Sequence, residues 1–90
     1  MIKITEESIK EHLIISRGWE KRNVSHAYLL EYHSSDNRYR LVRTEFSNLG
    51  SDEDGGWRLF IDDSKYCSLA CCDVEYIEQI FALIDVYKDY

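Results

Sequence analysis

The sequence contains no proline and only four glycines among its 90 residues. Flexible linkers are rich in proline, glycine or serine, and no such stretch is present, so residues 1–90 are predicted to form a single domain. No apolar run approaches the roughly 18 residues of a membrane-spanning helix, which excludes such a helix. We therefore expect no membrane partner. The apolar fraction of 44% and the aromatic fraction of 13% are ordinary for a folded protein and exclude a long disordered chain.

Cysteine is scarce and confined to one short stretch, at Cys67, Cys71 and Cys72. An odd number of clustered cysteines, in a chain whose first residues lack the pattern of a secretory signal, is typical of reduced thiols inside a cell. We therefore expect a cytoplasmic protein. The spacing Cys67-x₃-Cys71 supplies only half of a structural zinc site, so we expect no metal and no other cofactor, and we predict buried apolar thiols.

Positive charge is scarce in the second half of the chain. The net charge of −6 divides into +1 for residues 1–45 and −7 for residues 46–90. Proteins that bind nucleic acid in general carry a net positive charge, so nucleic acid is an unlikely partner. The acidity of the second half favours a basic protein surface instead.

The beginning of the chain has the pattern of an amphipathic helix. Thr5 can cap the first turn, Ile9 and Leu13 follow at helical spacing, and Gly18 suits the left-handed residue after the last turn. This pattern predicts a helix over 5–17.

Four strands are indicated in the middle of the chain by β-branched and aromatic residues bounded by turn formers. In one of them, Trp57, Leu59 and Ile61 share one face, and Arg58 and Phe60 share the other. The predicted strands cover 24–32, 38–46, 57–61 and 65–71. With a helix at each end, the order α-β-β-β-β-α predicts an α+β fold, a four-stranded antiparallel sheet flanked by N- and C-terminal helices.

The closing helix is predicted to begin after Asp73 as its N-cap, and its apolar arc is wider than one sheet face needs. Its surplus consists of Tyr76, Leu83, Tyr87 and Tyr90. Tyrosine is enriched at protein interfaces, so these residues predict a symmetric homodimer through this helix. The alternative is that Tyr87 and Tyr90 fold over the edge of the sheet.

Two charged groups offer further candidate sites. The acidic residues gather at one end of the predicted hairpins, where they could meet a basic partner: Asp52, Glu53, Asp54, Asp62 and Asp63. Basic residues next to an aromatic ring, as in single-stranded nucleic-acid sites, occur at Arg38, Arg40 and Arg43. The alternative for the arginines is a solvated face on which they pair with Glu31 and Glu45.

Catalytic signatures are absent from the sequence. No G-x-S-x-G elbow surrounds a serine, and no glycine-rich loop opens onto Lys-Ser or Lys-Thr. We therefore expect no enzyme. The alternative is a small hydrolase or nucleotide-processing enzyme whose site forms across a dimer.

Three segments give the chain a recognisable arrangement: RGWE (17–20), GWRLFIDD (56–63) and DVEYIEQIFALI (73–84). In this arrangement the chain resembles small uncharacterised α+β proteins encoded by bacteria and their phages. The resemblance implies an α+β domain with an accessory role, and it carries no site residues. Together these observations favour a non-catalytic intracellular protein-binding domain, such as a phage-type inhibitor or accessory protein.

Overall fold

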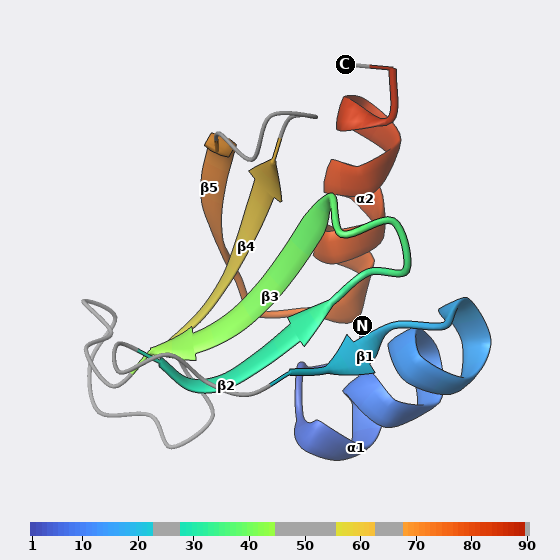
Figure 1. Ribbon diagram of the computed structural model, residues 1–90. Coiled ribbons are helices and arrows are strands. Elements are labelled where there is room, and N and C mark those ends of the chain that lie inside the picture. Colours follow the sequence, from blue (N-terminus) through green and yellow to red (C-terminus); the bar gives the residue numbers. More distant parts are fainter. Residues whose placement is uncertain (23–27, 45–55, 63–67, 90) are drawn as a thin grey trace.

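A computed structural model describes residues 1–22, 28–44, 56–62 and 68–89 of the chain. Its helical elements are α1 (Glu6–Ile9), the π-helical segment η1 (Lys10–Ile15) and α2 (Ile77–Tyr87). Its strands are β1 (Glu20–Lys21), β2 (Tyr28–His33), β3 (Tyr39–Thr44), β4 (Trp57–Asp62) and β5 (Ser68–Val74). The strands form one antiparallel sheet in the order β1-β2-β3-β4-β5 (Figure 1).

The α+β class and the antiparallel sheet with two flanking helices are confirmed, but the sheet has five strands rather than four. The additional strand, β1, pairs Glu20 with His33 and Lys21 with Tyr32. Two residues are too few to show the alternation of apolar and polar side chains by which a strand is recognised. Strand β1 is therefore recognised from its pairing with β2 and not from its own sequence.

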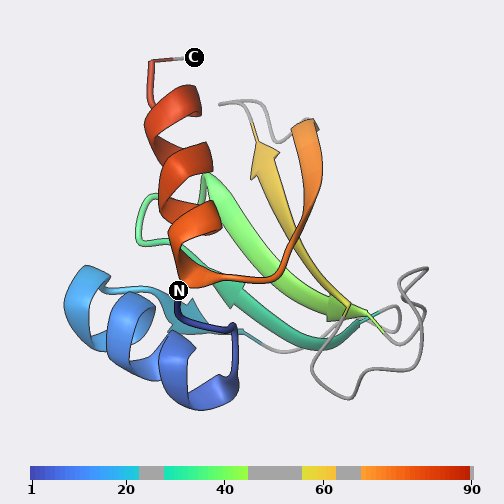
Figure 2. The same cartoon turned by 180° about the vertical axis from the view of Figure 1, so that it is seen from behind.

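One face of the sheet is covered by the helices and holds the core (Figures 1 and 2). The register aligns Tyr32, Leu41 and Leu59 across three neighbouring strands, and all three side chains are buried. The predicted apolar face of β4 is confirmed, because Trp57 and Ile61 are buried beside them. The helices and the N-terminal segment complete this core with Ile4, Ile9, Leu13, Ile77 and Ile80.

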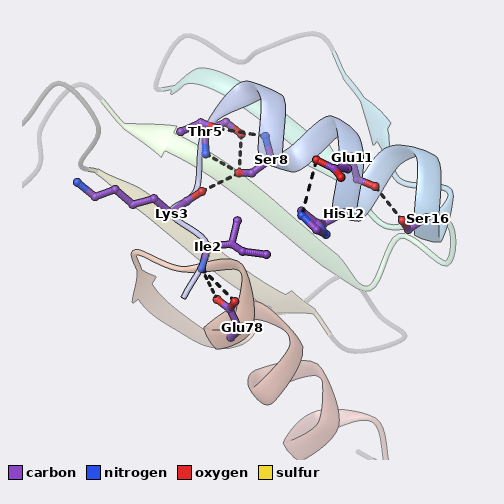
Figure 3. Close-up of polar contacts among 8 residues, drawn as sticks. All are labelled: Ile2, Lys3, Thr5, Ser8, Glu11, His12, Ser16 and Glu78. Atoms are coloured by element: carbon purple, nitrogen blue, oxygen red, sulfur yellow. Dashed lines mark hydrogen bonds and ion pairs between the residues drawn. The ribbon is translucent and has the colours of Figure 1, made fainter.

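The N-terminal helix begins where the sequence predicts. The Thr5 hydroxyl accepts a hydrogen bond from the Ser8 N–H at 3.0 Å, and the Ser8 hydroxyl oxygen accepts one from the Thr5 N–H at 2.8 Å (Figure 3). This reciprocal capping box satisfies two backbone donors that the first turn leaves without helical partners. The helix ends at Gly18, whose φ of 73° suits glycine, and the chain turns back to bury Trp19.

The beginning of the second helix differs from the prediction. Asp73 is not its N-cap, because β5 continues through Val74 and α2 begins only at Ile77. The N-cap residue is Tyr76, and the Gln79 side-chain oxygen accepts a hydrogen bond from the Tyr76 N–H at 2.9 Å. Asp73 instead accepts a hydrogen bond from Arg58 Nε at 3.0 Å on the neighbouring strand β4.

The N-terminal segment is bound to the start of α2 (Figure 3). The Ile4 N–H donates to the Glu75 carbonyl at 2.9 Å, and the Ile77 N–H donates to the Ile2 carbonyl at 2.8 Å. Both carboxylate oxygens of Glu78 lie 3.0 Å from the Ile2 backbone nitrogen. Hydrogen bonding from Ile2 lowers the pKa of Glu78. Residues 2–4 therefore pair with residues 75–77, just beyond the end of β5.

Candidate functional site

The face of the sheet opposite the helices carries a network of ion pairs. Arg40 Nε lies 2.8 Å from Asp62 Oδ2, and Arg40 Nη1 lies 3.9 Å from Glu31 Oε1. Glu31 Oε1 also lies 3.2 Å from His33 Nε2. Because Asp62 and Glu31 are both buried, these carboxylates are structural partners of Arg40. The predicted strand 57–61 extends by one residue, because Asp62 is the last residue of β4, and Asp62 of the predicted acidic site is buried against Arg40.

A hollow of about 380 Å³ opens beside this network. The side chains around it are Arg22, His33, Asn37, Arg40 and Asp62. Arg22 Nη2 donates to Asn37 Oδ1 at 3.1 Å and lies 3.3 Å from a carboxylate oxygen of Glu20. Both guanidinium groups are thus paired with carboxylates, and none of the lining residues carries a hydroxyl or thiol nucleophile. The ionisable groups that line this hollow are therefore the members of the ion-pair network and of the Arg22 contacts.

The three arginines of the predicted basic site do not lie together. Arg40 lies on the open face, where its guanidinium stacks 4.9 Å from the centre of the Phe60 ring. Arg43 pairs in register with Trp57 on the helix-covered face. Arg38 reaches the C-terminal end of α2, with Nη1 3.4 Å from the Lys88 carbonyl. The structure therefore does not bring Arg38, Arg40 and Arg43 together into one patch of the kind that tracks a nucleic-acid backbone.

Most of the predicted acidic partner site lies outside the described residues. This applies to Asp52, Glu53, Asp54 and Asp63. The same is true of Tyr90, of Cys67, and of Glu45 as a partner for the arginines.

The predicted dimer residues of α2 share one flank of the helix. Tyr76, Leu83 and Tyr87 are half-buried, and Leu83 and Tyr87 pack against the core. The opposite flank faces the C-terminal end of the N-terminal helix, because the Arg17 guanidinium lies 4.0 Å from the centre of the Phe81 ring. At 100° per residue Leu83 lies about 160° around the helix from Phe81, on the flank away from Arg17. Figures 1 and 2 show β5 on the side of the molecule opposite the N-terminal helix.

The two edges of the sheet differ in how well they are protected against pairing with another chain. Strand β1 is only two residues long, and both are charged, Glu20 and Lys21. Strand β5 is seven residues long, and only Asp73 among them is charged. Natural edge strands are usually short, charged or covered. Over the part of the chain that the structure describes, nothing pairs with the outer edge of β5, and Leu69 is 46% exposed there.

The backbone directions along β5 follow from one hydrogen bond and the register. The Asp62 N–H donates to the Arg38 carbonyl at 2.8 Å, so this pair exchanges hydrogen bonds between β3 and β4. Peptide groups alternate in direction along a strand. Residues 57, 59 and 61 therefore point their peptide groups at β5, where their partners are Val74, Cys72 and Ala70. Between those partners, Cys71 and Asp73 direct their N–H and C=O groups outward from the sheet.

The cysteines of β5 differ from the prediction of buried thiols. Cys71 is exposed, and Cys72 is half-buried on the helix-covered face. Cys71 pairs with Phe60 on the open face of an edge strand, where no helix covers it. Desolvation by the surrounding sheet raises the pKa of the Cys71 thiol, against the opposing effect of Arg58. The thiol is therefore not an activated nucleophile.

Among the described residues, no group of three His, Cys, Asp or Glu side chains could hold a metal ion. No helix in the described ranges is long and apolar enough to cross a membrane. Comparisons with protein-family models, with curated proteins and with solved structures found no match. The most distinctive surface feature of the described residues is the unpaired edge of β5. Sequence reasoning missed this edge because the alternation within a strand does not show which strand is outermost.

Proposed function

We propose that this chain is a non-catalytic protein-binding domain that takes up an extended segment of its partner along the outer edge of β5. The observation that carries the proposal is the outward direction of the Cys71 and Asp73 peptide groups on a seven-residue edge strand. An exposed edge of this kind is a template for an added strand, whose main-chain hydrogen bonds supply affinity.

The neighbouring side chains support the same role. Leu69 offers exposed apolar surface on the edge itself, and the half-buried flank of α2 with Tyr76, Leu83 and Tyr87 adds aromatic surface on the same side. Tyrosine and aliphatic contacts next to a strand pairing are typical of protein interfaces. An accessory protein or inhibitor in the cytoplasm is one form of this role.

Site-specific photo-crosslinking in cells tests the proposal. A photoreactive amino acid is placed at Leu69 on the β5 edge, and in a matched control at Glu20 on the short β1 edge. We expect Leu69 to yield discrete crosslinked proteins and Glu20 to yield none. Equal crosslinking from both edges, or none from Leu69, would contradict the proposal.

A further inference from the structure

We infer that the segment paired with the β5 edge is β5 of a second copy of this chain, arranged around a twofold axis that passes through Cys71. This inference rests on the proposed use of the β5 edge and names its occupant. It converts two five-stranded sheets into one continuous antiparallel sheet.

The symmetry follows from the position of Cys71. It is the central residue of the seven-residue strand Ser68–Val74, and its own N–H and C=O groups point outward. When two copies align antiparallel on this residue, Ala70, Cys71 and Cys72 of one copy pair with Cys72, Cys71 and Ala70 of the other. Leu69 is the extra residue of a β-bulge between Ala70 and Ser68 and lies beside Asp73 of the second copy. At the axis each Cys71 N–H donates to the Cys71 carbonyl of the other copy, so neither outward peptide group is left to water.

The neighbouring residues limit how far the register can slide. Sliding the second strand past Val74 would meet the N-terminal segment, because the Glu75 carbonyl already accepts the Ile4 N–H. Centring the axis on Asp73 would bring two aspartates directly opposite each other, which is destabilising in a cross-strand pair. Centring it on Cys71 places Asp73 opposite Leu69 of the second copy and keeps the two aspartates apart.

The side-chain arrangement across the axis is also self-complementary. An axis perpendicular to the sheet keeps both α2 helices on the same face, and it turns their Leu83 flanks toward each other. This is the flank that lies away from Arg17 and is half-buried in the single chain. The dimer predicted from Tyr76, Leu83 and Tyr87 thus receives a backbone interface along β5 beside the helix contact.

Sedimentation equilibrium of the full chain, together with two charge variants, tests the inference. The wild type is expected to form dimers as its concentration is raised. Leu69→Asp sets an aspartate opposite Asp73 at both symmetric positions and should raise the dimer dissociation constant about tenfold or more. Leu69→Lys loses the same leucine but sets a lysine opposite Asp73. Its dimer dissociation constant should therefore be about tenfold or more lower than that of Leu69→Asp. Far-ultraviolet circular dichroism confirms that each variant is folded.

Crosslinking locates the axis independently of these variants. In chains that keep only Cys71, the two Cys71 Cα atoms of a hydrogen-bonded pair lie about 5.5 Å apart, within the range of a disulfide, so mild oxidation should link the two copies. Chains that keep only Cys72 should crosslink poorly, because Cys72 lies opposite Ala70. Equal crosslinking of both single-cysteine chains, or equal weakening by Leu69→Asp and Leu69→Lys, would overturn the register.

A wild type that stays monomeric at every concentration would overturn the second copy as the occupant. Photo-crosslinking from Leu69 distinguishes the absence of a dimer from the absence of any partner on the β5 edge. Crosslinks of twice the chain mass identify a second copy, whereas crosslinks of other masses support edge binding by a different protein and contradict the dimer.

Discussion

Arg40 and Asp62 face each other across strands β3 and β4, with Nε 2.8 Å from Oδ2 and Nη2 3.3 Å from Oδ1. Asp62 is 5% exposed, and the Arg40 guanidinium also stacks on the ring of Phe60. This pair removes one base from the predicted arginine patch and one acid from the predicted acidic surface. Its role is to stabilise the open face of the sheet.

Removing the carboxylate of this pair leaves Arg40 partly buried without its closest partner. Asp62→Ala is therefore expected to lower the free energy of unfolding by about 1.5–3 kcal/mol, as for a lost hydrogen bond to a charged group. Urea denaturation at neutral pH measures the change. The matched control is Asp73→Ala, whose pair with Arg58 is more exposed and should contribute less than about 1 kcal/mol. Equal losses in the two variants would contradict the structural role of Asp62.

The capping box at Thr5 is expected to stabilise the N-terminal helix by a similar amount to other N-caps. Thr5→Ala should lower the free energy of unfolding by about 1 kcal/mol, because the Ser8 N–H loses its acceptor. Ser16→Ala is the control, since the Ser16 hydroxyl only donates to the Glu11 carbonyl within the same helix. Chemical denaturation of both variants distinguishes the cap from a general effect of losing a hydroxyl. A general effect would lower the free energy of unfolding equally in both variants.

The contact between Glu78 and the Ile2 N–H makes a pH-dependent contribution to stability. The pKa of Glu78 is lowered in the folded chain, so its carboxylate stabilises the fold above the ordinary glutamate range. The contribution is lost as the pH falls through the lowered pKa. Glu78→Gln should therefore melt below the wild type at neutral pH, and the two melting temperatures should converge in acid. Glu11→Gln controls for one lost surface carboxylate, and the same pH profile in both variants would argue against the Ile2 contact.

The pKa of the Cys71 thiol is raised, and its two charged neighbours act in opposite directions. In chains whose other cysteines are replaced by serine, alkylation of Cys71 should require a higher pH than alkylation of an unfolded peptide, because only the thiolate reacts. Arg58→Gln should move the rate profile further upward, and Asp73→Asn should move it downward. Shifts in the same direction for both variants would contradict this account of the thiol.

The sequence predicted those parts of the fold that depend on local patterns. Ile9 and Leu13 at helical spacing, and Trp57, Leu59 and Ile61 at strand spacing, are all buried as their periodicity indicated. The features that depend on distant partners were not predictable in this way. Asp62 looks like a turn residue until Arg40, 22 residues away, is placed beside it.

The candidate site shows the same limit. The exposure of Cys71 depends on whether its strand is central or at the edge, and strand order is a property of the whole sheet. Asp73 resembles an N-cap in sequence because acidic residues suit helix starts, but pairing with β4 extends β5 through Val74 and delays the helix. The proposed dimer residues of α2 were predicted from their surplus of apolar surface, whereas the strand edge beside them leaves no local signal.

Amide hydrogen exchange measured by nuclear magnetic resonance tests the pairing of the β5 edge most directly. The Cys71 and Asp73 amides point away from the sheet, whereas the Ala70 and Cys72 amides point toward β4 and serve as internal references. At high protein concentration, we expect Cys71 and Asp73 to become protected, and at low concentration to exchange rapidly, with the references protected throughout. Rapid exchange of Cys71 and Asp73 at every concentration would contradict the pairing of β5 with a second copy.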